Sequence, residues 1–141
     1  MTTMSIASDP RTEKELIKEL FKLSSNPYSD AKVKQAYTMI KKESFSVKRL
    51  KAERKLAEYF LEHDSGSSGE LIDTIGPTFS TMSTLSLYKL GLVIREQDSN
   101  NLRCFIYHRI ADKEKLSDYI DLMNRLIEKI ERIKEVGYSE S

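Results

Sequence analysis

The sequence predicts a mainly α-helical protein with one small β-hairpin, which places it in the α+β class. Only 5 Gly and 3 Pro occur among 141 residues, so few positions interrupt helices. Apolar residues recur every three or four positions through most of the chain, which is the helical period. One run, residues 102–110, instead alternates between two sets of side chains, as a strand does. The length is close to the commonest for a single domain.

Composition excludes several classes of protein. A single cysteine rules out a disulfide framework and a Cys-rich zinc module. No apolar run approaches the roughly 20 residues that a membrane span needs, so we expect no membrane partner. Residues 1–9 lack the basic and apolar regions of a signal peptide. These features favour a cytoplasmic protein.

The N-terminal region, residues 12–46, is expected to form two helices behind a flexible tail, residues 1–11. Thr12 is the predicted N-cap of the first helix, and Glu15 completes a capping box. A Ser-Ser-Asn-Pro sequence ends that helix, and the Ser-Asp pair that follows can cap the second.

The central region begins with a predicted helix over residues 47–63. Residues 64–69 are Gly- and Ser-rich and are expected to form a flexible connector. A short helix over residues 70–75 follows, and Gly76 with the proline after it marks its end. A further helix is predicted over residues 78–90.

The hairpin follows, with strands at residues 92–97 and 102–110 around a turn rich in Asp, Ser and Asn. Residues 112–136 return to a helical pattern. We assign residues 111–141 as a C-terminal helical region.

Helix, short helix, tight turn, helix and hairpin is the element order of a winged helix-turn-helix. Over residues 47–110 the sequence resembles winged-helix transcription regulators of the ArsR/MarR type. The Lys-, Glu- and Ile-rich helices have an archaeal character. The resemblance is carried by Glu-Leu-Ile-Asp-Thr-Ile-Gly at 70–76, Ser-Thr-Met-Ser-Thr-Leu at 80–85 and Tyr-Lys-Leu-Gly-Leu-Val at 88–93.

The resemblance implies that residues 78–90 are a recognition helix, with Leu87 among its outward positions. The polar side chains that would contact DNA are Thr78, Ser80, Thr81, Ser83 and Thr84. This stretch holds no Arg or Asn for a bidentate base contact, so modest sequence discrimination is expected. The alternative is a hydroxyl-bearing face that is merely solvated.

Cationic side chains suggest contacts with the DNA backbone. Net charge is only +1, but residues 32–55 carry 9 basic and 2 acidic side chains. Within this block the predicted DNA contacts are Lys48, Arg49, Lys51 and Lys55, three of which share a helical face. Around the wing they are Lys89, Arg95 and Arg103. The alternatives are a solvated helix face and ordinary strand-edge charge.

The C-terminal helix carries an apolar stripe with heptad spacing, typical of dimerising helices. Its members are Leu116, Tyr119, Ile120, Met123, Leu126, Ile127, Ile130 and Ile133. A two-fold dimer would place paired recognition helices about one DNA turn apart. The alternative is packing of this stripe within one chain.

Catalysis and cofactors have little support. His63 and His108 lie in no recognisable motif, and Cys104 has no companion thiol. Cys104 is expected to be a small buried hydrophobe, and the alternative is a redox-sensing thiol. The sequence therefore favours a homodimeric, non-enzymatic regulator that binds double-stranded DNA, acts as a repressor and needs no metal or cofactor. The alternative is a winged-helix module that binds proteins in a larger assembly.

Overall fold

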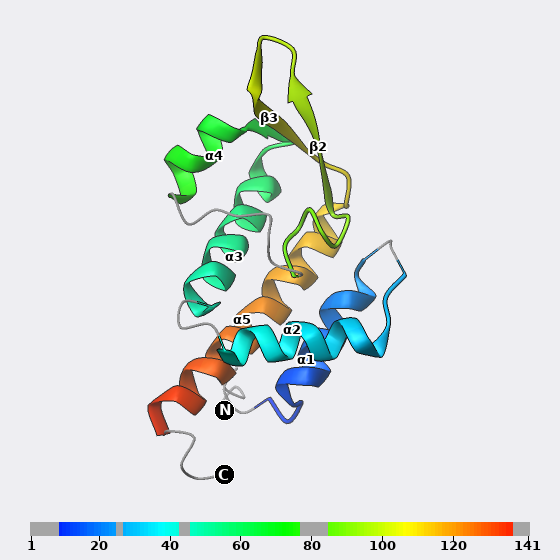
Figure 1. The fold of residues 1–141 in the computed structure, drawn as a ribbon, viewed down its shortest axis with the longest axis vertical. Helices are drawn as coiled ribbons and strands as arrows, with labels where there is room; N and C mark the ends of the chain where they lie inside the picture. The colour runs from blue at the N-terminus through cyan, green and yellow to red at the C-terminus, as the bar shows by residue number, and fades with distance from the viewer. Residues whose placement is uncertain (1–8, 25–26, 43–45, 77–84, 137–141) are drawn as a thin grey trace.

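The computed structural model describes residues 9–24, 27–42, 46–76 and 85–136. They form a mainly helical α+β fold in which a three-stranded antiparallel sheet lies at one end (Figure 1). The helices are α1 (Glu13–Lys22), α2 (Asp30–Lys42), α3 (Ser46–Glu62), α4 (Ser68–Ile75) and α5 (Lys113–Val136). The strands are β1 (Ser65–Ser67), β2 (Val93–Asp98) and β3 (Asn101–Arg109).

The predicted start of α1 is confirmed at the level of single hydrogen bonds. The Thr12 hydroxyl accepts the Glu15 N–H at 3.1 Å, and the Glu15 carboxylate accepts the Thr12 N–H at 2.8 Å. Reciprocal bonds of this kind satisfy backbone donors that a helix leaves unpaired at its first turn. A local sequence signal therefore sufficed to place this helix.

The expectation of a flexible connector at residues 64–69 is wrong. Ser65, Gly66 and Ser67 pair with β3 as strand β1, and Ser67 then caps α4 in a capping box with Glu70. Gly66 lies close to Tyr59: a Cβ there would lie 2.9 Å from the ring, so a larger residue would displace that side chain. Pairing with β3 overrides the poor strand propensity of Gly and Ser.

The hairpin prediction is confirmed, and β3 is the central strand in the order β1-β3-β2. Tyr107 is buried on the inner side of β3, whereas Ile94 and Ile110 are about half exposed. Cys104 lies three positions before Tyr107, on the opposite face of β3, and is only half-buried. The expectation that it is a buried small hydrophobe is therefore wrong.

The core lies where α5 packs against α3 and α1 (Figure 1). Most of the apolar stripe of α5 is fully buried there, namely Leu116, Tyr119, Met123, Leu126, Ile127 and Ile130. Ile120 is half-buried, and the side chain of Ile133 lies outside the described residues. The assignment of this stripe as a dimer interface is therefore corrected: it is covered by helices of the same chain, because α5 is the element that closes the core.

The predicted flexible tail extends too far. Asp9 is buried, and its carboxylate accepts hydrogen bonds from Arg11 at 2.8 Å and from Arg125 of α5 at 2.9 Å. Lys129 donates to the Asp9 carbonyl at 2.8 Å. Residues 9–11 are thereby tied to α5 by contacts more than a hundred positions apart in sequence.

Candidate nucleic-acid interface

The predicted recognition helix, residues 78–90, is wrong over the part that the structure describes. Leu85 to Gly91 forms consecutive turns rather than a helix. Leu87, expected to point outward, is fully buried, as are Leu85 and Leu90. Positions two apart lie on nearly opposite sides of a helix, so a surface helix could not bury both Leu85 and Leu87. The predicted contacts Thr78, Ser80, Thr81, Ser83 and Thr84 lie outside the described residues.

Two buried polar side chains hold this turn in place. Glu53 of α3 accepts the Leu87 N–H at 3.2 Å, and the Tyr119 hydroxyl of α5 donates to the Leu85 carbonyl at 2.7 Å. The second carboxyl oxygen of Glu53 has no hydrogen-bond partner within the described part of the chain. Burial raises the pKa of Glu53 to about 8, so the carboxyl is protonated at neutral pH.

The sequence pattern did not single out Glu53, which counted only as one of the two acidic side chains among residues 32–55. A signal was nevertheless present. Glu53 lies three positions after Leu50 and three before Leu56, both buried, and so falls on the apolar face of the helix. A carboxylic acid on such a face indicates a buried acceptor for a backbone donor.

Arg95, a predicted DNA contact, is engaged inside the protein. Its guanidinium lies 4.5 Å from the ring centres of both Tyr88 and Phe105. A hydrogen bond to Tyr107 raises the pKa of Arg95 further above its usual value. Arg95 therefore fastens the turn that ends at Gly91 to the hairpin, and its charge is partly screened from an external ligand by two aromatic faces.

Replacing Arg95 by Ala is expected to lower the free energy of unfolding by roughly 1 to 2 kcal/mol, since two cation–π contacts are lost. Urea titration followed by circular dichroism measures this change. Lys89→Ala is the matched control, because it removes an exposed cation from the turn that contains Tyr88. Equal stability of the two variants would contradict the fastening role.

The other wing cations differ in their surroundings. Lys89 is exposed, and the side chain of Arg103 lies outside the described residues. Arg109, by contrast, is bound to the Asp64 carboxylate at 2.6 Å and to the Ala111 carbonyl at 3.0 Å. Among the predicted wing contacts whose side chains the structure describes, Lys89 is exposed to solvent and Arg95 is half-buried.

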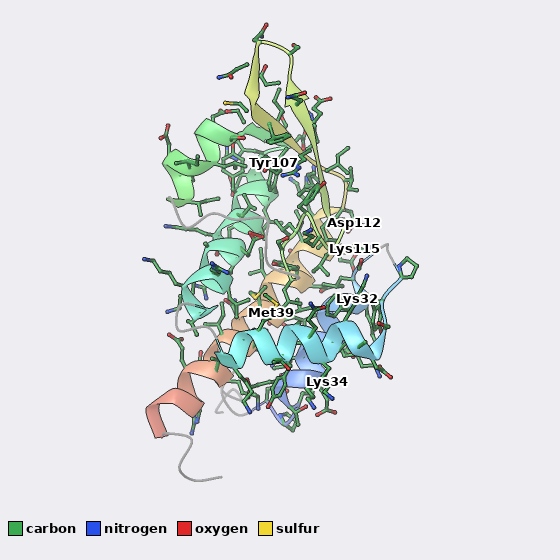
Figure 2. The ribbon with its side chains drawn as sticks, in the orientation of Figure 1. Lys32, Lys34, Met39, Tyr107, Asp112 and Lys115 are labelled. Atoms are coloured by element: carbon green, nitrogen blue, oxygen red, sulfur yellow. The ribbon has the colours of Figure 1, made fainter. Side chains whose placement is uncertain are left out.

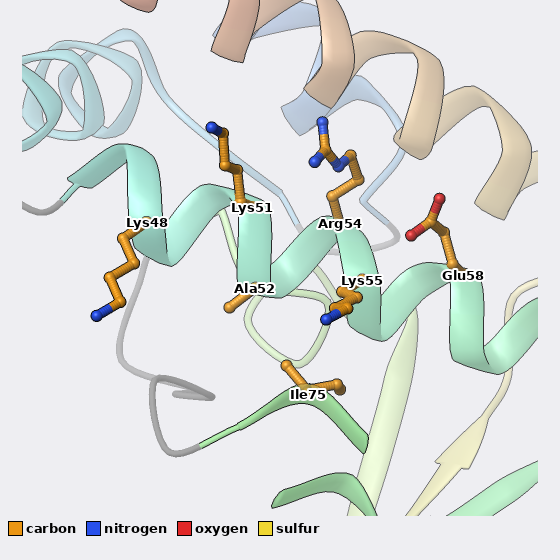
Figure 3. A pocket seen from close by; sticks show the side chains of 7 residues that line it. All are labelled: Lys48, Lys51, Ala52, Arg54, Lys55, Glu58 and Ile75. Carbon is orange, nitrogen blue, oxygen red and sulfur yellow. The ribbon is translucent and has the colours of Figure 1, made fainter. Parts of the chain in front are cut away.

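The structure brings Lys48, Lys51 and Lys55 of α3 to one groove, as their spacing predicts (Figure 3). The groove has a volume of about 330 Å³ and is closed on one side by the end of α4. Its lining consists of Lys48, Lys51, Ala52, Arg54, Lys55, Glu58 and Ile75. Arg49 is half-buried, does not line this groove and has interactions of its own within the protein.

One wall of the groove is anchored to α5. Lys51 forms an ion pair with Glu131 at 2.8 Å, and Arg54 donates to the side-chain oxygen of Asn124 at 2.9 Å. Lys48 and Lys55 are exposed, and neither has an ion-pair partner among the described residues. The groove therefore combines two held cations with two that are available to an anion.

No family model matches this chain, and no curated protein or solved structure shows significant similarity to it. Among the residues that the structure describes, no group of three or more His, Cys, Asp or Glu side chains is placed to hold a metal ion. Within the same residues, no helix is both long and apolar enough to cross a membrane.

Proposed function

We propose that this protein is a winged-helix regulator that binds double-stranded DNA. The observation that carries the proposal is the order of elements: α3, β1 and α4, then an intervening segment, then the β2–β3 hairpin, with β3 central in the sheet. A hairpin beside a compact helical unit has the form of a wing, and the sequence over the same residues resembles winged-helix regulators.

The charge distribution supports the same proposal. Lys48 and Lys55 are exposed on α3, and Lys89 is exposed where the hairpin begins. Contacts between lysines and phosphate oxygens provide most of the affinity of non-specific DNA binding. Sequence preference would then come from the Ser and Thr side chains between α4 and the hairpin, and from DNA shape.

We further propose that the regulator acts as a homodimeric repressor that occupies promoter DNA and excludes other factors. Regulators with two-fold symmetry bind pseudo-palindromic sites. The dimer interface would lie outside the apolar stripe of α5, since six of its members are buried within one chain. Light scattering during gel filtration measures the mass in solution.

Salt-dependent binding to a fluorescent duplex tests the function. We expect the logarithm of affinity to fall steeply with the logarithm of salt concentration, by about 0.9 per phosphate contacted. The double variant Lys48→Ala/Lys55→Ala should weaken binding to all duplexes alike and reduce the slope by about 2. The matched control is Lys32→Ala/Lys34→Ala, which removes two exposed lysines of α2 outside the groove (Figure 2).

Absence of binding at low salt, or a flat salt response, would overturn the DNA-binding proposal and favour a protein-binding winged helix. Selection of bound duplexes from a random pool then measures specificity. Replacing Thr81 or Thr84 should change the selected sequence, whereas the lysine variants should not.

A further inference from the structure

The α3–α4 groove is concave rather than a flat charged surface. Its volume of about 330 Å³ lies at the lower end of the range for small-ligand sites. Ala52 and Ile75 form its apolar part, and both are almost completely buried. Apolar walls strengthen electrostatic attraction to a ligand, because they keep water away from one side of it.

Charge within the groove is unbalanced. Four of the seven lining side chains are cationic and one, Glu58, is acidic. Lys51 and Lys55 are four positions apart on one helix, and Lys48 is three positions before Lys51, spacings at which like charges repel. The ion pair with Glu131 offsets the charge of Lys51 only. A bound anion would relieve this repulsion.

The direction of α3 adds to the imbalance. Lys48 lies near the start of the helix, and its first turn contains no acidic residue. Helix N-termini carry partial positive charge and ordinarily favour acidic side chains. Both the side chains and the backbone of this end of α3 therefore attract negative charge.

The wall of the groove that contacts α5 has two cations already held in position. Glu131 and Asn124 of α5 hold the side chains of Lys51 and Arg54, so these cations lose less freedom when an anion binds. Lys48 and Lys55 point toward the α4 side in Figure 3, opposite Lys51 and Arg54. An elongated anion lying along α3 would have cations on both of its sides.

From this juxtaposition we infer that the α3–α4 groove is a binding site for linked phosphate groups. The DNA backbone is one source of such groups, and a free polyphosphate-bearing small molecule is the other. With DNA as the source, the inference rests on the proposed function and deepens it. With a free ligand, binding in the groove stands by itself, and only the regulation of DNA binding rests on that function. In the second case the ligand competes with DNA for Lys48 and Lys55, and so regulates DNA binding.

The test uses two probes on the full chain, inorganic tripolyphosphate by isothermal titration calorimetry and a fluorescent duplex by anisotropy. Lys48→Ala/Lys55→Ala should weaken binding of at least one probe by about tenfold or more, since two charge-assisted contacts are lost. Lys32→Ala/Lys34→Ala removes the same charge outside the groove and should change either affinity by less than about twofold. Circular dichroism confirms that both variants are folded.

The outcomes separate the two sources. Loss of tripolyphosphate binding, with displacement of the duplex by tripolyphosphate, supports a free ligand; selective loss of duplex binding alone supports the DNA backbone. Equal losses in the groove variant and the α2 variant, or binding of neither probe, would overturn the inference. Tripolyphosphate binding without duplex binding would support the groove as a phosphate site and overturn the proposed DNA-binding function. Duplex binding that is unchanged by Lys48→Ala/Lys55→Ala, with no tripolyphosphate binding, would support the proposed function and overturn the groove as a phosphate site.

Discussion

Replacing Glu53 by Gln is expected to remove a pH dependence of stability between about pH 4.5 and pH 8. Burial raises the pKa of Glu53 from its ordinary value of 4.5 to about 8 in the folded protein. Below pH 4.5 the carboxyl is protonated in both states. Between the two values the unfolded chain releases the proton while the folded chain keeps it, so stability is lost as the pH rises toward the folded pKa.

The size of this effect follows from proton linkage. The free energy of unfolding should fall by up to about 1.4 kcal/mol per pH unit, and by on the order of 5 kcal/mol across the window. Glutamine keeps an oxygen that can accept the Leu87 N–H and does not ionise. The variant should therefore lack this slope, whatever its absolute stability.

Urea unfolding at a series of pH values, for wild type and variant, measures the difference in slope. Glu62→Gln, which replaces an exposed carboxylate on the same helix, is the matched control and should follow the wild type. Parallel curves for wild type and Glu53→Gln would show that the carboxyl is ionised in the folded protein and would contradict its burial beside Leu87.

Replacing Asp9 by Ala is expected to lower the free energy of unfolding by roughly 2 to 4 kcal/mol. The Asp9 side chain is only 2% exposed and accepts charge-assisted hydrogen bonds from Arg11 and Arg125. Its removal leaves two partly buried guanidinium groups without their shared carboxylate. The attachment of residues 9–11 to α5 should be lost with it.

Acid sensitivity provides a second readout. The hydrogen bonds from Arg11 hold the pKa of Asp9 well below its usual range. Stability from this group is thus present above the ordinary carboxyl pKa of 3.8 and is lost as the pH falls toward the folded value. Asp9→Ala should therefore lose less stability than the wild type on acidification.

Asp121→Ala is the matched control for Asp9→Ala. Its carboxylate also binds Arg125, at 3.0 Å, but is 56% exposed. Exposed ion pairs contribute about 0 to 1 kcal/mol, so the control should be nearly as stable as the wild type. Similar losses in the free energy of unfolding for the two variants, measured by urea titration, would show that burial of Asp9 does not strengthen its ion pairs.

Several elements were predictable because their signals are local. The Thr12–Glu15 capping box predicted the start of α1, and alternation around a polar turn predicted the hairpin. Apolar periodicity predicted α5 almost to its ends. Within the candidate site, the i, i+3, i+7 spacing predicted a shared face for Lys48, Lys51 and Lys55. All three line one groove, but Lys51 is directed toward Glu131 of α5 and the other two toward α4.

Other features could not be predicted from local sequence signals, because the residues that they contact are distant in the chain. Strand β1 has the composition of a linker and becomes a strand through β3, about forty residues later. The stripe of α5 has heptad spacing whether a second chain or the same chain covers it, and α1 and α3 cover it here. Arg95 was assigned to DNA by its place near the wing, but its guanidinium contacts the rings of Tyr88 and Phe105.

Local signals placed most helices and the hairpin, because caps, helix-ending residues and apolar periods act between neighbours a few positions apart. Which charged residues are buried and which face solvent depends instead on how distant segments of the chain pack together. Glu53 is neutral and Asp9 is a buried anion because of what packs around them. Lys48 and Lys55, on the same helix as Glu53, are exposed at a groove. Burial depends on contacts between distant segments, and it sets both the cost of a charge and its availability to a partner.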